Sequence, residues 1–149
     1  MEIFDYIRKP INSSEREKRI QNAQKLYPYY GSTSQAGYID DYLLDGEFVL
    51  LGEDAAPFLD RNAEKSYIVK GKFWVNNHAH ILKSKTNNKF LKYYLDWFDY
   101  QGYVSGTTRL KLNQQMMKKI PLLTCDISIK KQIVFFIEQS FQLLNLISQ

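Results

Sequence analysis

The strand-like segments of this chain follow one another directly, and most helical segments come after them. Short runs rich in β-branched and aromatic residues, bounded by turn residues, occupy residues 37–44, 47–52, 66–70, 72–75 and 78–82. Asp45-Gly46 is a dipeptide typical of a hairpin turn. Because no helix separates successive strands, the pattern does not favour repeated βαβ units. The order of the segments therefore predicts an α+β fold with a mixed or antiparallel sheet.

Helical signals flank this strand region. Ser14 and Glu17 have the spacing of a capping box, which predicts a short polar helix over residues 15–25. Residues 87–100 carry apolar side chains at helical spacing, and residues 112–119 form a shorter candidate that ends before Pro121. The several helices complete the α+β assignment.

A last helix begins near Asp126 or Ser128 and carries a broad apolar stripe. The stripe consists of Ile129, Ile133, Phe136, Ile137, Phe141, Leu144 and Ile147. A stripe this wide must pack on the body of the chain or on another helix. We therefore expect two parts, a globular domain over residues 1–125 and a C-terminal helix over residues 126–149.

Composition excludes several classes of protein. No run of about 18 apolar residues is present, which argues against a membrane-spanning helix. Cys125 is the single cysteine, so an internal disulfide and a cysteine-based metal cage are excluded, and we expect a cytoplasmic location. Residues 71–149 hold eleven Lys and Arg against four Asp and Glu, which makes this half the better candidate for a phosphate-facing surface. Charges that segregate in sequence but mix in space are the alternative.

The segment Ser105-Gly106-Thr107-Thr108-Arg109-Leu110-Lys111 leads into the 112–119 helix. Backbone N–H groups and hydroxyls near a helix start favour a phosphate, and an arginine binds guanine or phosphate through two hydrogen bonds. A capped helix entry with a solvated Arg109 explains the same residues. Chemistry alone leaves the two interpretations open.

His78 and His80 lie two residues apart, so on a strand both side chains would point to one face. Together with Glu53 and Asp54 they could form a small metal-dependent nuclease. No third ligand stands at a recognisable spacing, and no lysine closely follows Glu53. We expect no metal and no catalytic residue, and a structural role for the histidines is favoured.

Several short motifs follow one another in a fixed order along the chain. They are Tyr29-Tyr30-Gly31-Ser32, Gly37–Tyr42, Asp45-Gly46, Gly52-Glu53-Asp54, Asn62, Gly71–His80, Ser105-Gly106-Thr107 and Lys111-Leu112-Asn113. In this order they resemble one target-recognition domain of the DNA-specificity subunit of type I restriction-modification enzymes, and the resemblance covers nearly the whole chain from Tyr27 onward. The chain departs from the family in having one recognition domain instead of two. Its last helix also begins Ser128-Ile-Lys-Lys-Gln, where the family shows an acidic start.

The resemblance implies a non-catalytic function. Such a subunit reads one half of a bipartite sequence in double-stranded DNA and directs methyltransferase and restriction subunits to it. S-adenosylmethionine, ATP and Mg²⁺ would be needed only by those partners, so we expect no cofactor here. The C-terminal helix would act as a spacer and pair with a second half-subunit or with a second copy in a homodimer.

Residue chemistry and loop position give the candidate DNA contacts. They are Tyr29, Ser32, Thr33, Ser34, Arg61, Asn62, Lys83, Lys85, Thr107, Thr108, Arg109 and Lys111. The candidate pairing residues of the last helix are Ile133, Phe136, Ile137, Phe141, Leu144 and Ile147. Two alternatives to DNA recognition remain at this point, the nuclease and a protein-interaction module that uses the last helix and binds no DNA.

Overall fold

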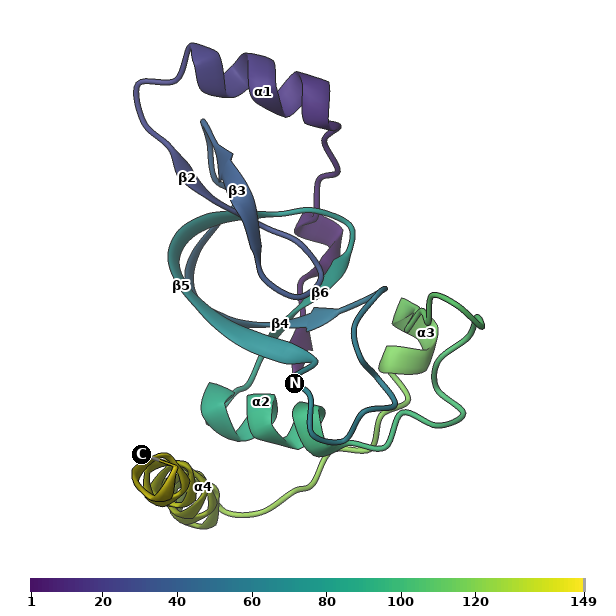
Figure 1. The fold of residues 1–149 in the computed structure, drawn as a ribbon, viewed down its shortest axis with the longest axis vertical. Coiled ribbons are helices and arrows are strands. Elements are labelled where there is room, and N and C mark those ends of the chain that lie inside the picture. The colour runs from purple at the N-terminus through teal and green to yellow at the C-terminus, as the bar shows by residue number, and fades with distance from the viewer. Residues whose placement is uncertain (149) are drawn as a thin grey trace.

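The computed structural model describes residues 1–148 and has an α+β fold built on one six-stranded sheet (Figure 1). The strands are β1 (Glu2–Ile3), β2 (Tyr27–Tyr30), β3 (Gln35–Ile39), β4 (Leu44–Gly52), β5 (Ser66–Val75) and β6 (Ala79–Lys83). The helices are the 3₁₀ helix η1 (Asp5–Ile7), α1 (Ser13–Gln21), α2 (Asn88–Trp97), α3 (Gln114–Met117) and α4 (Ile127–Ile147). In Figure 1, α1 lies beside β2 and β3 at one end of the molecule, and α2 and then α4 lie at the other.

The sheet is mixed, as the sequence predicts. Its strand order is β1-β6-β4-β5-β2-β3. All neighbouring strands are antiparallel except β2 and β5, which run parallel with Tyr29 opposite Trp74. Because β5 is long and bends strongly, the sheet curls on itself (Figure 1). The curl brings the chain after β5 back toward the end of β4, where Glu53 N donates to His78 O (2.8 Å).

Asp45-Gly46 does not form the predicted hairpin. Both residues lie inside β4, where Asp45 pairs with Lys72 and Gly46 pairs with Gly71 of β5. Gly46 and Gly71 have φ values of 141° and 84°, a region that favours glycine. Two facing glycines therefore let β4 and β5 bend together without ending. The predicted strands 66–70 and 72–75 are accordingly one continuous strand.

Helix α1 also differs from its prediction. The capping residue is Asn12, whose side-chain oxygen accepts from Glu15 N (2.8 Å), and not Ser14. The helix ends at Gln21, four residues before the expected end. Asn12 and Ser14 are both good capping residues, so the sequence alone did not identify which one starts the helix.

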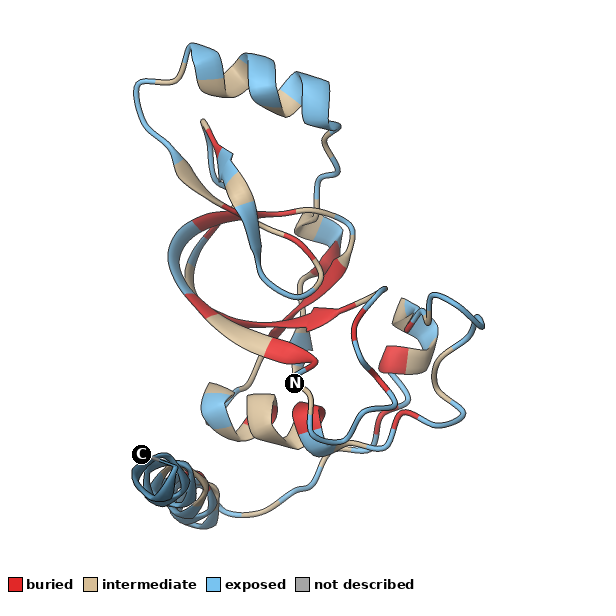
Figure 2. Cartoon of the chain, viewed as in Figure 1, coloured by how far each residue is buried: buried red, intermediate tan, exposed pale blue. Residues whose placement is uncertain are grey.

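The central strands are buried on both faces of the sheet. Val49 and Leu51 of β4 pack with Leu91 and Leu95 of α2 on one face. The alternating residues, Phe48 and Leu50, pack inside the curl with Phe73 of β5 on the other. Figure 2 shows the buried residues concentrated in β4, β5 and β6, whereas α4 is almost entirely exposed.

Helix α4 confirms the predicted long C-terminal helix, and Asp126 occupies its N-cap position. It contacts α2 through the rings of Phe141 and Tyr93 (centroids 6.3 Å apart) and through an ion pair between Glu138 and Lys89, and Val134 is its buried residue. Gln149, the last residue of the predicted helix segment, lies outside the described residues. Within residues 1–148, no helix combines the length and the apolar character that a bilayer crossing requires.

Candidate nucleic-acid interface

Four loops meet at the end of β4. They are residues 31–34, 52–55, 76–78 and 105–111, which we call the loop cluster. Ser32 O lies so close to Gly52 that a Cβ atom on Gly52 would be 3.0 Å from it. Asn76 N donates to Tyr30 O (3.2 Å), which holds the 76–78 turn beside the 31–34 loop. Segments from distant parts of the sequence thus form one continuous surface.

The 105–111 loop is tied down by backbone hydrogen bonds. Ser105 and Lys111 exchange two of them, with Ser105 N donating to Lys111 O (3.0 Å) and Lys111 N to Ser105 O (2.8 Å). Leu112 N donates to Glu53 O (2.7 Å), and Ala55 N donates to Leu110 O (3.2 Å). The loop therefore has a fixed base and an exposed tip.

The loop presents hydroxyl and cationic side chains, from Thr107, Thr108 and Arg109 at its tip and from Lys111 at its base. Thr107, Thr108, Arg109 and Lys111 are all exposed. Arg109 Nη2 donates to Asp54 Oδ1 (3.0 Å), and Lys111 Nζ lies 3.4 Å from Glu53 Oε1. On the adjoining 31–34 loop, Thr33 and Ser34 are exposed and Ser32 is half-buried.

A buried polar group lies beneath the loop. His80 is fully buried in β6, with Nδ1 2.7 Å from Asp5 Oδ2 and Nε2 2.8 Å from Leu112 O. Both ring nitrogens therefore face oxygen atoms, a carboxylate on one side and a backbone carbonyl on the other. Gln114 Nε2 also donates to Asp5 Oδ2 (3.1 Å), and Ile81 N donates to Asp5 Oδ1 (2.8 Å). Asp5 thus joins η1, β6 and the start of α3.

Charge and hydrogen bonding set the ionisation of Asp5. Burial acts to raise the pKa of the Asp5 carboxyl, but the hydrogen bond and charge of His80, the Ile81 N–H and the charge of Arg8 together hold it below its usual value. Asp5 is therefore an anion in the folded chain under neutral conditions. An anion at this depth requires the partners that surround it.

The side chains of the alternative nuclease site do not converge. Asp54 is engaged by His78 and Arg109, and Glu53 by Arg8 and Lys111. His80 is engaged by Asp5, and His78 lies in the turn before β6, so the two imidazoles do not share a site. In the described part of the chain, no group of three or more His, Cys, Asp or Glu side chains is arranged to hold a metal ion. The geometry does not favour the nuclease alternative.

Some predicted DNA contacts lie outside the loop cluster. Tyr29 is 5% exposed and packs with Ile39 and Trp74, so its ring is part of the core. Arg61 and Asn62 lie in the connection between β4 and β5. Arg61 pairs with Asp99, just beyond the end of α2, and Asn62 is exposed. Lys83 lies over the Phe48 ring and Lys85 lies 3.8 Å from Glu2, both at the opposite end of β6 from the loop cluster.

Sequence reasoning missed the residues that support the loop from below, namely Asp5, Arg8 and Gln114. Asp5 is 75 positions from His80 and 109 positions from Gln114. No local pattern marks such a contact. The one available signal was the presence of His80 within an apolar strand, because a buried imidazole requires hydrogen-bond partners.

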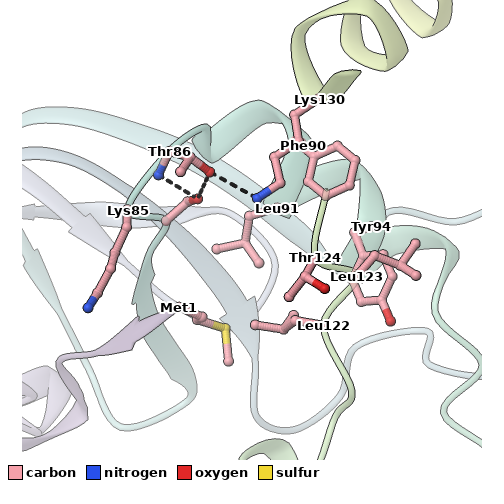
Figure 3. Close-up of a pocket in the computed structure, with 11 residues that line it drawn as sticks. Met1, Lys85, Thr86, Phe90, Leu91, Tyr94, Leu122, Leu123, Thr124 and Lys130 are labelled. Atoms are coloured by element: carbon pink, nitrogen blue, oxygen red, sulfur yellow. Dashed lines mark hydrogen bonds between the residues drawn. The ribbon is translucent and has the colours of Figure 1, made fainter. Parts of the chain in front are cut away.

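A cavity of about 160 Å³ lies away from the loop cluster, between α2 and the segment that precedes α4 (Figure 3). Phe90, Leu91, Tyr94 and Leu122 give it an apolar wall. At its rim, Lys130 Nζ donates to Thr86 Oγ1 (3.1 Å), which links α4 to the turn before α2. The cavity therefore lies where the start of α4 and the segment before it contact the rest of the chain.

Comparison with known proteins places this chain in a family. Residues 1–149 match the family model described as "Type I restriction modification DNA specificity domain". The chain is also 36% identical over 134 residues to a Haemophilus influenzae protein that carries the name of a type I restriction enzyme specificity subunit. The match covers 89% of this chain but 33% of that protein, so the chain spans about a third of its relative's length.

Proposed function

Because this chain belongs to the type I restriction-modification DNA specificity domain family, we propose that it recognises a specific sequence in duplex DNA through the loop cluster and catalyses no reaction itself. One observation carries the proposal. Arg109, Lys111 and two threonines project from a loop whose base is fixed by backbone hydrogen bonds. Hydroxyl and guanidinium groups are the side chains that contact phosphates and base edges.

The proposed target is one half of a bipartite site. A single loop cluster at the end of one curled sheet offers a contact surface that suits a few base pairs in one major groove. Reading a second half-site requires a second domain, and the H. influenzae relative is long enough to hold more than one region of this size. Methyltransferase and restriction subunits would bring S-adenosylmethionine, ATP and Mg²⁺, and the complex would act in the cytoplasm.

Binding of the purified chain to duplex DNA tests this function. The affinity should be modest and should fall with salt, because a small loop surface makes few phosphate contacts. A slope of roughly −3 to −6 in log affinity against log salt corresponds to about four to six such contacts. Selection of bound duplexes from a random pool, with the partner methyltransferase present, should yield a common sequence. Absence of binding at low salt with that partner present would contradict the proposal.

The exposed face of α4 supports a second part of the proposal, pairing with another copy of this chain. Val134, Ile137 and Phe141 lie on the side toward α2, whereas Phe136 and Ile147 are 67% and 81% exposed. The outward apolar residues follow one another at intervals of four, three, seven and four, the spacing of a coiled-coil seam in which Ser140 takes one position. They are Ile129, Ile133, Phe136, Leu143 and Ile147, with Leu144 beside them. An α4 helix from a second copy fits this seam, and two-fold pairing would place two loop clusters on one DNA molecule.

A further inference from the structure

We propose that Glu53 and Asp54 are positioning residues, which hold Lys111 and Arg109 ready in the free chain and release them to DNA without losing their own second partners, Arg8 and His78. This inference rests on the proposed function of the loop cluster. The two carboxylates directly follow β4, and each one bridges an inner partner from another segment and an outer cation of the 105–111 loop. In the nuclease alternative they would be metal ligands, a role that does not describe these contacts.

Asp54 is the clearer of the two bridges. Its Oδ1 accepts from Arg109 Nη2 (3.0 Å), and its Oδ2 lies 2.9 Å from His78 Nδ1. The Asp54 side chain is 15% exposed, whereas that of Arg109 is 64% exposed. Burial acts to raise the pKa of Asp54, but the hydrogen bonds from His78 and Arg109 bring it below its usual value, so the carboxyl stays ionised. The His78 side chain is 42% exposed, and Arg109 is the more accessible of the two, so we call His78 the inner donor and Arg109 the outer one.

Glu53 repeats this arrangement. Its Oε2 is bonded to Arg8 Nη1, and its Oε1 lies 3.4 Å from Lys111 Nζ. Arg8 is held from behind, because it also donates to Ala79 O (3.2 Å) and lies 3.6 Å from Asp5 Oδ2. The Glu53 side chain is 12% exposed and that of Lys111 is 54% exposed. Here the inner partner is Arg8 and the outer one is Lys111.

The two-partner arrangement has an energetic consequence. A half-buried carboxylate that loses its only cation is left as an uncompensated charge, which is strongly unfavourable. Asp54 keeps its hydrogen bond with His78 when Arg109 turns to a phosphate or a guanine, and Glu53 keeps its ion pair with Arg8 when Lys111 does so. The outer cations are thus held in place before binding and remain available to the DNA. Arg61 and Asp99 form an ordinary surface pair by comparison, with side chains 79% and 55% exposed.

Hydrogen exchange in the DNA-free chain tests the positioning. Asp54→Asn and Glu53→Gln should each speed exchange at the Ser105 and Lys111 amides by about tenfold, the factor that corresponds to loss of one charge-assisted hydrogen bond. Amides of Phe48–Leu51 in β4 report global unfolding and should keep their wild-type rates. Asp99→Asn is the matched control, because it breaks an Arg–Asp pair elsewhere and should leave the loop unchanged. Arg109→Gln, at an exposed position, gives the same test if the carboxylate variants fail to fold.

A double-mutant cycle tests the release to DNA. His78→Ala removes the inner partner of Asp54, so Arg109 becomes harder to release and the affinity for a duplex selected from a random pool should fall about fivefold to tenfold. The same substitution in an Arg109→Ala background should have no effect, because there is then no cation to release. An equal loss in both backgrounds would make His78 a direct DNA contact and would overturn the release mechanism.

The outcomes separate this inference from the proposed function. If the wild-type chain binds no duplex, DNA recognition fails, while the exchange rates still decide whether the carboxylates order the loop. If the chain binds DNA but Asp54→Asn, Glu53→Gln and Arg109→Gln leave loop exchange unchanged, the positioning role is wrong and the proposed function stands. Faster loop exchange together with a cycle that depends on Arg109 supports both steps.

Discussion

The loop cluster and helix α4 are the two most exposed functional candidates of this chain, and they present opposite chemistry. At the loop cluster, Arg109 and Lys111 each have a carboxylate partner, and a buried polar group supports the loop. In the region covered by residues 1–148, every buried side-chain nitrogen and oxygen has a hydrogen-bond partner. On α4, by contrast, a row of large apolar side chains faces outward without any such cover. The charged side chains of the loop cluster thus have partners within one chain, whereas the outward apolar side chains of α4 are left exposed to solvent.

The largest effect is expected where the loop is anchored. Asp5→Ala would leave the buried His80 ring without its anion and should lower the free energy of unfolding by about 3–5 kcal/mol. Urea denaturation followed by circular dichroism measures this loss. Asp41→Ala, at an exposed position, is the control and should change stability by less than about 0.5 kcal/mol. Equal stability of the two variants would show that the polar group does not anchor the loop.

The tip of the loop should affect binding instead of stability. Arg109→Ala should weaken DNA binding by about 1–3 kcal/mol and relax selectivity at one base pair if Arg109 reads a guanine. Lys70→Ala removes an equally exposed cation that pairs with Glu47 at 2.8 Å, away from the loop cluster, and should leave selectivity unchanged. Selection of bound duplexes with each variant measures the difference. Uniform weakening across all sequences would identify Arg109 as a phosphate contact.

Acid should weaken the carboxylate contacts of the loop cluster. The pKa values of Asp5 and Asp54 are lowered in the folded chain. When folding lowers the pKa of a carboxyl, the stability that the carboxylate contributes is fully present above its pKa in the unfolded chain, about 3.9. This stability is lost as the pH falls through the pKa in the folded chain. The urea concentration at the midpoint of unfolding should therefore fall as the pH is lowered below about 4. Asp5→Asn should flatten this dependence, and an unchanged slope in that variant would assign the acid sensitivity to other groups.

Much of this architecture could be predicted from the sequence, because local patterns determine it. The α+β class, helix α2, helix α4 and the strand around Phe48–Leu51 follow from periodicity and from runs of apolar residues. Asp45-Gly46 misled the prediction, because the facing Gly71 of β5 turns a hairpin signal into a bend within a strand. The support of the site could not be predicted, because Asp5 and His80 meet through the pairing of β1 with β6 and not through any spacing in the sequence.

The smallest effect on folding, and the sharpest test of the comparison, is expected on α4. Phe136→Asp/Leu144→Asp places charges on the outward face, so it should disrupt pairing while changing the stability of the chain by less than about 0.5 kcal/mol per position. Sedimentation should show a wild-type dimer and a folded monomeric variant. Val134→Ala is the contrasting control, because Val134 is buried and its loss should loosen α4 on its own chain without dissociating the dimer. A wild type that stays monomeric at high concentration, with a charged variant that unfolds, would mean that α4 belongs to the core of one chain. The apolar row of α4 would then not be a pairing surface, and the loop cluster and α4 would differ only in polarity.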